Sequence, residues 1–477
     1  MNELYVRIRG DVVVGVPESY VYLTTYVLLE QEDWFEREIR FVRRFLRPGM
    51  HCVDIGANYG VYALTIAKAV MPGGSVTAFE PTAATAARLR ASVARNGFTH
   101  LRIVPLALSA AEGTRELHTY ENSEMNSLAP TRDDMASTIE TVAISTLDRQ
   151  QAALQWPSID FVKIDAEGEE AHILDGGEAF FRAQSPLVMF EIVDTRGDQR
   201  DRLAPRFKSL GYDLYRLIGP DALLVPASFG AEIGTADYNL FACKPDRAAQ
   251  LAASGLLVLE VASRVATTGG AGRVLYHRQP YATAFGHPAM CGERYGTALD
   301  AYAHWRDPTR APDERCAALR DSFIAAEGAM RERPSLARLS TFGRIACEMA
   351  RPELAAQVAT GVIELLTRGA SPPDEPFFPI DRRYDQHVPA NPQQWLLASS
   401  LQAMEEWRTP SGYYIPIEAQ RLDILDWLQT TPFASAPIER RRQLQRIHAG
   451  LQRQRMRVPL LARAAPDNLN PELWAGA

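Results

Sequence analysis

Cysteine is scarce in this sequence: there are five in 477 residues, at scattered positions, and no two form a C-x-x-C pair. Disulfide-stabilised domains need paired cysteines, and zinc knuckles need closely spaced ones. The scarcity therefore argues against a disulfide framework and a zinc knuckle, and it is typical of a protein from a reducing compartment.

Long apolar runs and a signal peptide are also missing. The first eleven residues, MNELYVRIRGD, carry charges and contain no apolar stretch. The most apolar early run, residues 20–29, is far too short to span a bilayer and is bounded by Glu18 and Glu30. We therefore expect a cytoplasmic protein without a membrane span.

Blocks of lysine and arginine are absent as well. The formal net charge is −7, from 51 basic and 58 acidic residues, which argues against general binding to nucleic acid. The hydrophobic fraction of 46% is enough for a packed core, and the length predicts two or three domains.

Between about residues 50 and 245, short β-branched runs alternate with longer helical patterns. The predicted strands are 51–55, 75–80, 101–108, 159–165, 187–192, 213–218 and 238–244. Strand–helix–strand spacing of this kind predicts an α/β fold, a parallel sheet with helices on both faces. The last two strands lie close together in the sequence, and we expect them to form a hairpin that leaves an antiparallel strand at the edge.

The flanking segments have a different character. Residues 11–16 predict an extra strand, and residues 33–49 predict an amphipathic helix. Residues 267–290 have the composition of an irregular linker. Helical patterns follow near 295–306, 313–332, 335–350, 352–368, 392–407, 416–430 and 437–455, with a proline-rich interruption at 371–392.

One helical hairpin, residues 336–366, resembles a single tetratricopeptide-like unit, with Gly343, Ala346 and Ala355 where two helices would approach closely. The predicted domains are an N-terminal segment 1–50 that packs on the catalytic domain, a ligand-binding sheet domain 51–250, and a helical domain 270–477.

A glycine turn follows the first predicted sheet strand. In VDIGANYGVYAL, residues 53–64, an apolar run ends at Asp54, and Gly56 and Gly60 precede a helical pattern. A dinucleotide site needs G-x-G-x-x-G, whose middle glycine is missing here, and a P-loop needs a Lys-Ser/Thr pair, which is also missing. The turn is therefore poorly shaped for phosphate, and Asp54 favours a cation.

The next strand ends in Glu80, which lies 20 residues after Gly60. An acid at this position can accept hydrogen bonds from both ribose hydroxyls. The ligand should therefore carry a ribose and a positive charge and need no phosphate, and S-adenosylmethionine meets these requirements. A dinucleotide-dependent oxidoreductase is the alternative, and it is also possible that Asp54 and Glu80 only cap helices.

A second acidic cluster lies in IDFVKIDAEGEEAHILDGG, residues 159–177. Asp165 ends a strand, Glu167 and His172 follow, and Glu191 ends the next strand. Since ligands in open α/β sheets bind at the carboxyl ends of strands, these four residues are the candidate general bases. One or two of the glutamates after Asp165 should be structural, because the start of a helix favours acids. Asp165 and Glu191 are also the ligands of a less favoured hypothesis, a bound Mg²⁺.

Several motifs occur in an order that resembles the FkbM-type methyltransferases. They are VDIGANYGVYAL (53–64), AFEP (78–81), NSL (126–128), STLD (145–148) and VKIDAEGEEAHILDGG (162–177). The resemblance covers roughly residues 20–245, and its most specific part runs from Lys163 to Leu174. It implies a Rossmann-like class I sheet of seven strands, the last antiparallel, and an S-adenosylmethionine-dependent enzyme that methylates hydroxyls of sugars or natural products.

The resemblance also implies roles for individual residues. Asp54, Gly56, Asn58 and Gly60 form the cofactor turn, Glu80 binds the ribose, and Ala107 with Leu108 flanks the adenine. Asn126 and Ser127 lie on a loop that closes over the cofactor, and the acidic segment before the sheet places Glu36 or Glu38 near it. Asp165 or Glu167 is the favoured base, because both belong to the matched pattern.

No resemblance covers residues 270–477, which we expect to modify substrate choice or to dock a protein partner. A non-catalytic scaffold with such a docking half is a further alternative to the enzyme.

Overall fold

The computed structural model describes residues 2–120, 122–128, 138–192, 199–230, 237–263, 267–286, 288, 292–415, 419–450 and 460–474. The chain forms two compact units, which are described separately. The first comprises Met1–Arg216, Asp237–Leu257 and Gly450–Ala477, and the second comprises Leu217–Ala236 and Val258–Ala449. The domain limits predicted from the sequence remain a proposal.

The first unit begins with an antiparallel hairpin of β1 (Glu3–Ile8) and β2 (Val12–Pro17), followed by α1 (Leu23–Gln31) and α2 (Glu38–Phe45). The strand predicted at 11–16 corresponds to β2. The predicted helix 33–49 is shorter than expected and begins at Glu38, but its apolar stripe of Ile39, Phe41, Val42 and Phe45 is buried.

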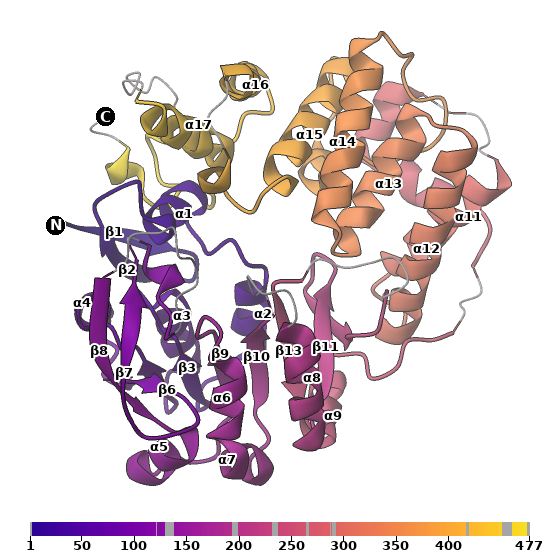
Figure 1. Ribbon diagram of the computed structural model, residues 1–477. Coiled ribbons are helices and arrows are strands. Elements are labelled where there is room, and N and C mark those ends of the chain that lie inside the picture. The colour runs from indigo at the N-terminus through magenta and orange to yellow at the C-terminus, as the bar shows by residue number, and fades with distance from the viewer. Residues whose placement is uncertain are drawn as a thin grey trace. The chain divides into compact units, whose positions relative to one another are not determined.

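A large mixed sheet forms the core of the first unit (Figure 1). In spatial order its strands are β12 (Leu223–Pro226), β11 (Asp213–Ile218), β13 (Asn239–Cys243), β10 (Leu187–Glu191), β9 (Phe161–Ile164), β3 (His51–Ile55), β4 (Ser75–Phe79) and β5 (Leu101–Val104). Although β12 belongs to this sheet, its residues are part of the second unit.

The strands from β10 to β5 are parallel, whereas β13 is antiparallel to both β10 and β11. The last predicted strand, β13, is therefore antiparallel and pairs with β11 as expected, but it lies between β10 and β11 and not at the edge of the sheet.

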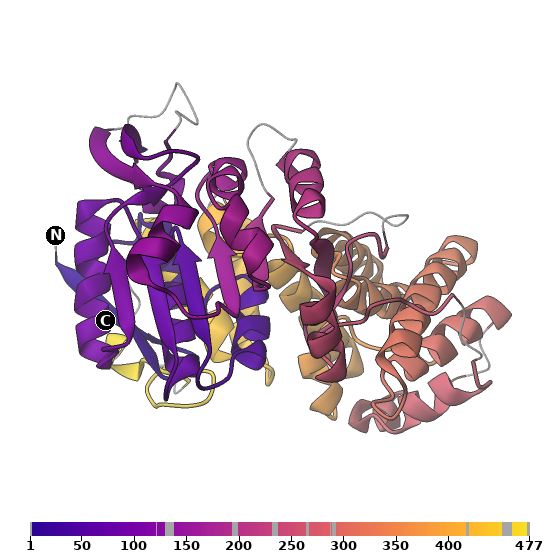
Figure 2. The ribbon, with the colours of Figure 1, turned by 90° about the horizontal axis from the view of Figure 1, so that it is seen from below.

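Helices cover both faces of this sheet, as Figure 2 shows. They are α3 (Val61–Val70), α4 (Ala83–Asn96), α5 (Leu147–Leu154), α6 (Glu170–Asp175), α7 (Glu178–Ala183), α8 (Gln199–Ser209) and α9 (Pro245–Ala253). Helix α4 ends at Asn96, and Gly97 follows in the left-handed conformation, as the Asn-Gly pair predicted.

The strand predicted over 101–108 is in fact two strands in different sheets. The chain turns after Val104, where the N–H of Leu106 bonds back to the Val104 carbonyl. A small second sheet then forms from β6 (Ala107–Leu108), β7 (Gly113–Thr119) and β8 (Thr138–Ser145), with the short helix η1 (Ser123–Met125) between β7 and β8.

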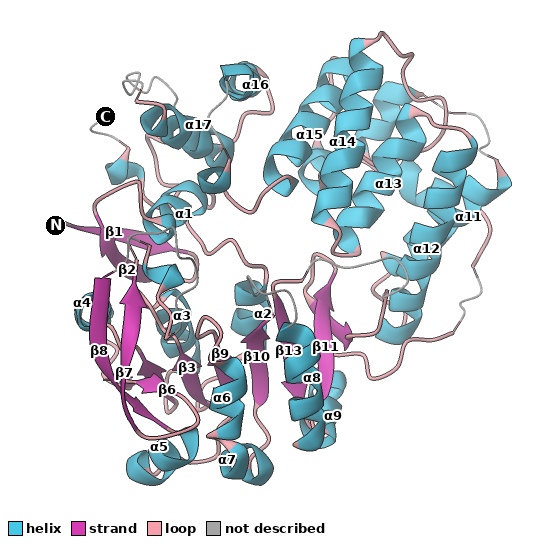
Figure 3. Cartoon of the chain, viewed as in Figure 1, coloured by secondary structure: helices cyan, strands magenta, loops and turns pink. Residues whose placement is uncertain are grey.

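The second unit is mostly helical, as the colours of Figure 3 show for residues 271–448. Its helices are α10 (Ala271–His277), η3 (Pro280–Phe285), α11 (Glu293–Trp305), α12 (Pro312–Glu332), α13 (Leu336–Glu348), α14 (Pro352–Thr367), η4 (Arg382–Gln386), α15 (Pro392–Trp407), η5 (Gly412–Tyr414), α16 (Ala419–Thr430) and α17 (Ala436–His448). None of the helices in the described ranges is both long and apolar enough to cross a membrane.

The prediction of an irregular linker at 267–290 was wrong, because α10 and η3 lie within it. The carboxylate of Asp300 accepts hydrogen bonds from the N–H groups of Gly270 and Gly272 at the start of α10. Tyr276 and Tyr281 bury their rings in the core of the second unit. Tertiary contacts have therefore ordered a segment whose composition suggested a loop.

The hairpin predicted at 336–366 is present as α13 and α14, which pack on each other. A side chain at Gly343 would lie 3.3 Å from Val358 of α14, so the glycine permits the close approach that its position suggested. Ala346 and Ala355 are fully buried.

The C-terminal segment returns to the first unit. Its short helix η6 (Pro471–Leu473) follows Asn470, whose side chain bonds to both backbone groups of Arg7 on β1 and to Glu32. The Glu32 carboxylate also accepts the N–H groups of Leu469 and Asn470, at 2.6 and 2.9 Å. The described residues 460–474 therefore fasten onto the N-terminal hairpin and the end of α1.

Candidate functional site

Strand register brings the predicted acids to one edge of the sheet. Ile55 of β3 is level with Phe79 of β4 and with Ile164 of β9, and Ile164 is level with Phe190 of β10. The next residue on each of these strands is a predicted site residue. Gly56, Glu80, Asp165 and Glu191 therefore lie side by side at the carboxyl edge, and Asp54 lies two residues before Gly56.

The glycine turn is hydrogen-bonded to the end of β4 and packs against the residue that follows β9. The N–H groups of Gly56 and Ala57 both bond to the Phe79 carbonyl, at 3.1 and 3.0 Å. Gly56 has φ +78°, and a Cβ there would lie 1.7 Å from the backbone oxygen of Asp165. Only glycine fits this position, so the turn depends on its first glycine.

The other turn residues also adopt left-handed conformations. Gly60 has φ +89° and precedes α3, and a Cβ there would lie 2.2 Å from Leu89. Asn58 has φ +48°, which asparagine tolerates better than most residues. The side chain of Asn58 accepts a hydrogen bond from Ser123 Oγ at 2.8 Å.

Glu80 is fixed by two backbone donors. Its Oε2 accepts the N–H of Asn58 at 2.9 Å and its Oε1 accepts the N–H of Thr82 at 2.8 Å. Burial raises the pKa of Glu80 to about 7, although these donors oppose the rise. Each carboxylate oxygen has a further lone pair, so Glu80 joins the glycine turn to the end of β4 and can still accept hydrogen bonds from a ligand.

Asp54 and Asp165 are linked through a buried lysine. Lys163 Nζ donates to Asp165 Oδ2 at 2.8 Å and lies 3.8 Å from Asp54 Oδ1. Asp54 is fully buried, and neither of its oxygens has a hydrogen-bond partner of standard geometry among the described residues. Burial raises the pKa of Asp54 to about 6, while Lys163 opposes the rise. A carboxylate of this kind is suited to a cationic or hydrogen-bonding ligand.

Glu36 approaches the same place from the segment before α2. Tyr62 on α3 donates a 2.6 Å hydrogen bond to Glu36 Oε2, and the Tyr62 ring lies 5.1 Å from Lys163 Nζ. Burial, together with the charges of Glu38 and Asp165, raises the pKa of Glu36 to about 7. The structure thus places the predicted acidic segment beside the sheet edge.

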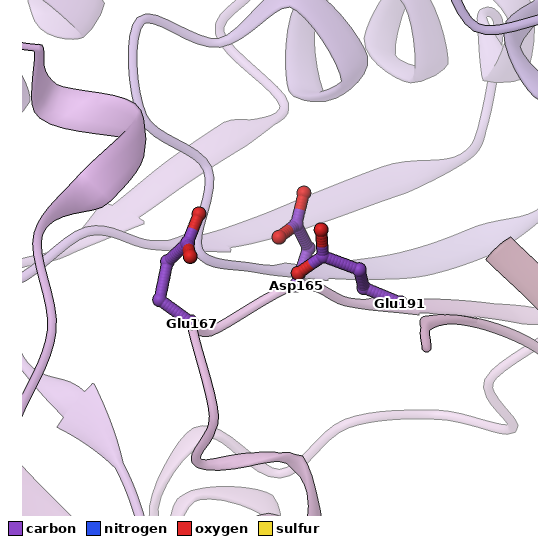
Figure 4. A group of neighbouring side chains, drawn as sticks. All are labelled: Asp165, Glu167 and Glu191. Atoms are coloured by element: carbon purple, nitrogen blue, oxygen red, sulfur yellow. The ribbon is translucent and has the colours of Figure 1, made fainter. Parts of the chain in front are cut away.

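Three carboxyl groups gather at the ends of β9 and β10. Asp165, Glu167 and Glu191 are turned toward the same space in Figure 4, and one oxygen of each lies within 4.8 Å of the others. Burial and the Asp165 charge raise the pKa of Glu167 and of Glu191 well above the ordinary value. Burial and a neighbouring negative charge make these two glutamates hold a proton more readily than an exposed carboxylate, so they can exchange one with a substrate.

The loop of residues 122–128 forms hydrogen bonds to α1, to the residue before α4 and to the segment after β9. Ser127 Oγ donates to the Glu167 carbonyl at 2.8 Å, and Asn126 Nδ2 donates to Thr82 Oγ1 at 3.3 Å. Both the N–H and the hydroxyl of Thr24 on α1 donate to Glu124 Oε1. The predicted loop residues therefore lie next to the glycine turn and the acid cluster.

The remaining glutamates of the second acidic segment support the backbone. Glu170 is fully buried and accepts the N–H groups of Ala166 and Gly168. Glu169 accepts hydrogen bonds from Ser109 and Arg115. The structure places His172 with Glu169, at 3.2 Å, and its side chain is 47% exposed. It does not bring His172 into the group of Asp165, Glu167 and Glu191.

Ala107 and Leu108 lie in the second sheet. They pair with Ile144 and Ser145 of β8, and Ala107 packs against a small apolar cluster that includes Leu117. The strand end that leads to the site is Val104, whose carbonyl accepts the Glu80 N–H. The proposed adenine contact therefore rested on a strand that the structure divides.

Three residues of the site were missed by sequence reasoning: Lys163, Tyr62 and Glu124. Lys163 lies inside the matched pattern, and the register of β3 and β9 pairs it with Asp54. Glu124 accepts a hydrogen bond from the N–H of Thr24. Burial raises the pKa of Glu124 to about 7. For Glu124, the only signal in the sequence was its position just before the NSL motif.

The donor set fits the adenosyl cofactor inferred from the sequence. It offers at Asp54 a buried acid whose oxygens have no hydrogen-bond partner of standard geometry in the described part of the chain, an anchored carboxylate at Glu80 and a glycine turn between them. The triad of Asp165, Glu167 and Glu191 offers the hard oxygen ligands that Mg²⁺ uses. One oxygen of Asp165 is already bonded to Lys163, however, so an ammonium occupies part of that set.

Comparisons with known proteins agree with the geometry. Residues 54–214 match a family model described as the methyltransferase FkbM domain. No curated protein matches the chain.

Similar solved structures include a methyltransferase FkbM from Methylobacillus flagellatus, with 14% identity over 43% of this chain and 50% of that chain and a TM-score of 0.28. Another is a SAM-dependent O-methyltransferase from Thermotoga maritima, with 14% identity over 50% of this chain and 77% of that chain and a TM-score of 0.28. At such TM-scores these similarities support no further conclusion.

Proposed function

Because residues 54–214 form an FkbM methyltransferase domain, we propose that this enzyme transfers the methyl group of S-adenosylmethionine to a hydroxyl of a sugar, a glycan or a secondary metabolite. The observation that carries the proposal is the row of Asp54, Glu80, Asp165 and Glu191 around a glycine turn at one sheet edge.

The cofactor would be held by groups from β3, β4 and the turn between β3 and α3. Asp54 has two buried oxygens for a charged amino group, and Glu80 is presented rigidly for ribose hydroxyls. Asn126 and Ser127 would close the site from the loop beside the turn. When bound, S-adenosylmethionine supplies a methyl group attached to a positively charged sulfur.

The residues of the chain would then align the acceptor oxygen and take its proton. Glu167 and Glu191 are the best-supported bases, because their pKa values are raised by burial and by the Asp165 charge. The ionised member of this pair would receive the hydroxyl proton at a carboxylate oxygen. Asp165, one of the two bases favoured by the sequence, has an oxygen engaged by Lys163 and is better suited to orientation. His172 is bonded to Glu169 and is less suited to the role.

The family match replaces the dinucleotide oxidoreductase considered from the sequence. The docking role of residues 270–477 stays a proposal, as does a divalent ion on Asp165 and Glu191. Full retention of activity after exhaustive chelation would remove the ion from the reaction.

The cofactor assignment is tested by calorimetric titration with S-adenosylmethionine and S-adenosylhomocysteine. We expect binding near the micromolar range by the wild type and a loss of at least about tenfold in Glu80→Ala. Glu116→Ala, which changes an exposed glutamate on β7, should bind as the wild type does. Failure of the wild type to bind either ligand would refute the proposal.

The acceptor class is tested with S-adenosylmethionine that carries a labelled methyl group. Neutral sugars, amino sugars and glycosylated metabolites are incubated with the full chain, and labelled products are analysed for ether linkages. Label that appears only on nitrogen, sulfur or carboxyl groups would contradict O-methylation and leave the cofactor assignment intact.

A further inference from the structure

Lys163 is a buried cation inside a group of acids. Its side chain is 4% exposed, and its ammonium donates to Asp165 Oδ2 at 2.8 Å, lies 3.8 Å from Asp54 Oδ1 and faces the Tyr62 ring. Burial alone would lower the pKa of Lys163, but the Asp165 and Asp54 charges raise it above its ordinary value. The lysine is therefore charged wherever these carboxylates are ionised.

The position of Lys163 follows from the sheet. Lys163 is level with Asp54 on the neighbouring strand, and side chains at the same level of adjacent strands point to the same face. Asp165 directly follows β9, two residues after Lys163, and its carboxylate accepts a hydrogen bond from the Lys163 ammonium. The lysine stem is buried in the sheet, and its ammonium lies between the cofactor turn and the acid cluster.

Asp165 depends on this contact for its orientation. Its side chain is 31% exposed, and the bond from Lys163 is the one hydrogen bond to its carboxylate within the described ranges. Its backbone carbonyl, in contrast, is fixed against Gly56. Without the lysine, the carboxylate would be free to rotate toward solvent or away from Glu167 and Glu191.

We propose that Lys163 is a positioning residue, which orients the Asp165 carboxylate between the cofactor turn and the Glu167–Glu191 pair. The inference rests on the proposed methyl transfer and adds a residue that acts through another. Lys163 itself would contact neither cofactor nor acceptor.

A purely structural lysine would have different consequences. If Lys163 only fills space, then methionine, which matches its stem, should replace it better than arginine, which is larger. If Lys163 works through its charge and its hydrogen bond, arginine should be the better replacement, since it keeps both. The two substitutions therefore separate shape from charge.

The experiment measures S-adenosylmethionine affinity by calorimetry and Tm by scanning calorimetry on the full chain. The variants are Lys163→Met, Lys163→Arg, Asp165→Asn and the double variant of Lys163→Met with Asp165→Asn. Lys208→Met is the matched control, because Lys208 makes an exposed 2.8 Å pair with Asp213.

We expect Lys163→Met to weaken binding at least about tenfold and Lys163→Arg to weaken it less. The double variant should bind no more weakly than its weaker parent, because both changes remove one interaction. Its Tm should exceed that of Lys163→Met, since neutralising Asp165 removes a partly buried charge that has lost its counter-ion. The control should match the wild type in both measurements.

Several results would overturn the inference. They are affinity losses that multiply in the double variant, Lys163→Met binding as the wild type does, and Lys163→Met binding better than Lys163→Arg. If Lys163→Met fails to fold, the comparison of the double variant with Asp165→Asn still decides, because a further loss there would show an independent role. Absence of binding by the wild type would instead refute the proposed function, and the inference with it.

Discussion

Gly56 shows how much a single atom matters in this site. An added Cβ would lie 1.7 Å from the Asp165 carbonyl oxygen, and the backbone φ of +78° is itself unfavourable for other residues. Neither group can move cheaply, because β3 and β9 are hydrogen-bonded to each other up to Ile55 and Ile164. The glycine is thus required by packing as well as by conformation.

We predict that Gly56→Ala lowers the free energy of unfolding by about 3–5 kcal/mol, from steric overlap added to backbone strain. Urea unfolding followed by circular dichroism measures this change. The matched control is Gly97→Ala, where φ is +68° but no atom lies within 4 Å, so only about 1 kcal/mol should be lost. Equal losses in both variants would contradict a steric cost specific to Gly56.

At the residue scale, the sequence predicted which acids lie together at the sheet edge when each acid ends a strand. Asp54, Glu80, Asp165 and Glu191 each terminate an apolar run, and a parallel sheet collects such ends at one edge. Lys163 was missed because its significance depends on register, which a single strand does not reveal. Glu124 was missed because its place depends on how a loop folds against α1.

At the scale of elements, the ends of β3, β4, β9 and β10 bring several acidic side chains together where solvent has little access. Glu80 illustrates the consequence, since it is 6% exposed and accepts hydrogen bonds from the backbone N–H groups of Asn58 and Thr82. Burial raises its pKa from 4.5 to about 7. The folded state therefore holds a proton on Glu80 that the unfolded chain has already released at the same pH.

The sign of the pH effect follows from this difference. With the folded pKa above the unfolded one, the contribution of Glu80 to stability is complete below about pH 4.5 and is lost as the pH rises through about 7. We predict that the ligand-free protein loses up to about 3 kcal/mol from this group between these limits. In Glu80→Gln the loss over this range should be smaller by that amount.

The measurement is urea unfolding at a series of pH values, comparing the slope of stability against pH and not its absolute value. Glu178→Gln serves as control, because Glu178 is exposed and bonded to Arg182. Parallel slopes for the wild type and Glu80→Gln would contradict the prediction.

Elements were predicted best where periodicity alone decides. The strands β3, β4, β11 and β13 and the hairpin of α13 and α14 followed from their patterns. The division of 101–108 into β5 and β6 did not, because the turn at Pro105 is set by pairing with a strand more than thirty residues later. Helix α10 was missed for a similar reason, since Asp300 of α11 supplies its N-terminal hydrogen bonds.

At the scale of the whole molecule, the first unit is assembled from both ends of the chain. Glu32 at the end of α1 is 2% exposed and receives three hydrogen bonds from Leu469 and Asn470. The same helix begins beside Thr24, which binds Glu124 of the loop at the site. The C-terminal segment thus binds a helix whose other end contacts the loop at the candidate site, a connection that no local sequence pattern could indicate.

We predict that Asn470→Ala destabilises the first unit alone, by about 2 kcal/mol, because it removes the two side-chain bonds to the backbone of Arg7 and the side-chain bond to Glu32. Each unit has its own core, so scanning calorimetry should resolve two transitions. S-adenosylhomocysteine should raise the Tm of one of them, and Asn470→Ala should lower that same transition.

The matched control is Asn391→Ala in the second unit, where Asn391 caps α15 by accepting the N–H of Gln394. It should lower the other transition, by about 1 kcal/mol, and leave the ligand-sensitive one in place. If Asn470→Ala instead shifts the ligand-insensitive transition, the C-terminal segment does not belong with the cofactor-binding unit. If a single transition responds to both substitutions and to the ligand, the two units unfold together, and the site draws its stability from the entire chain.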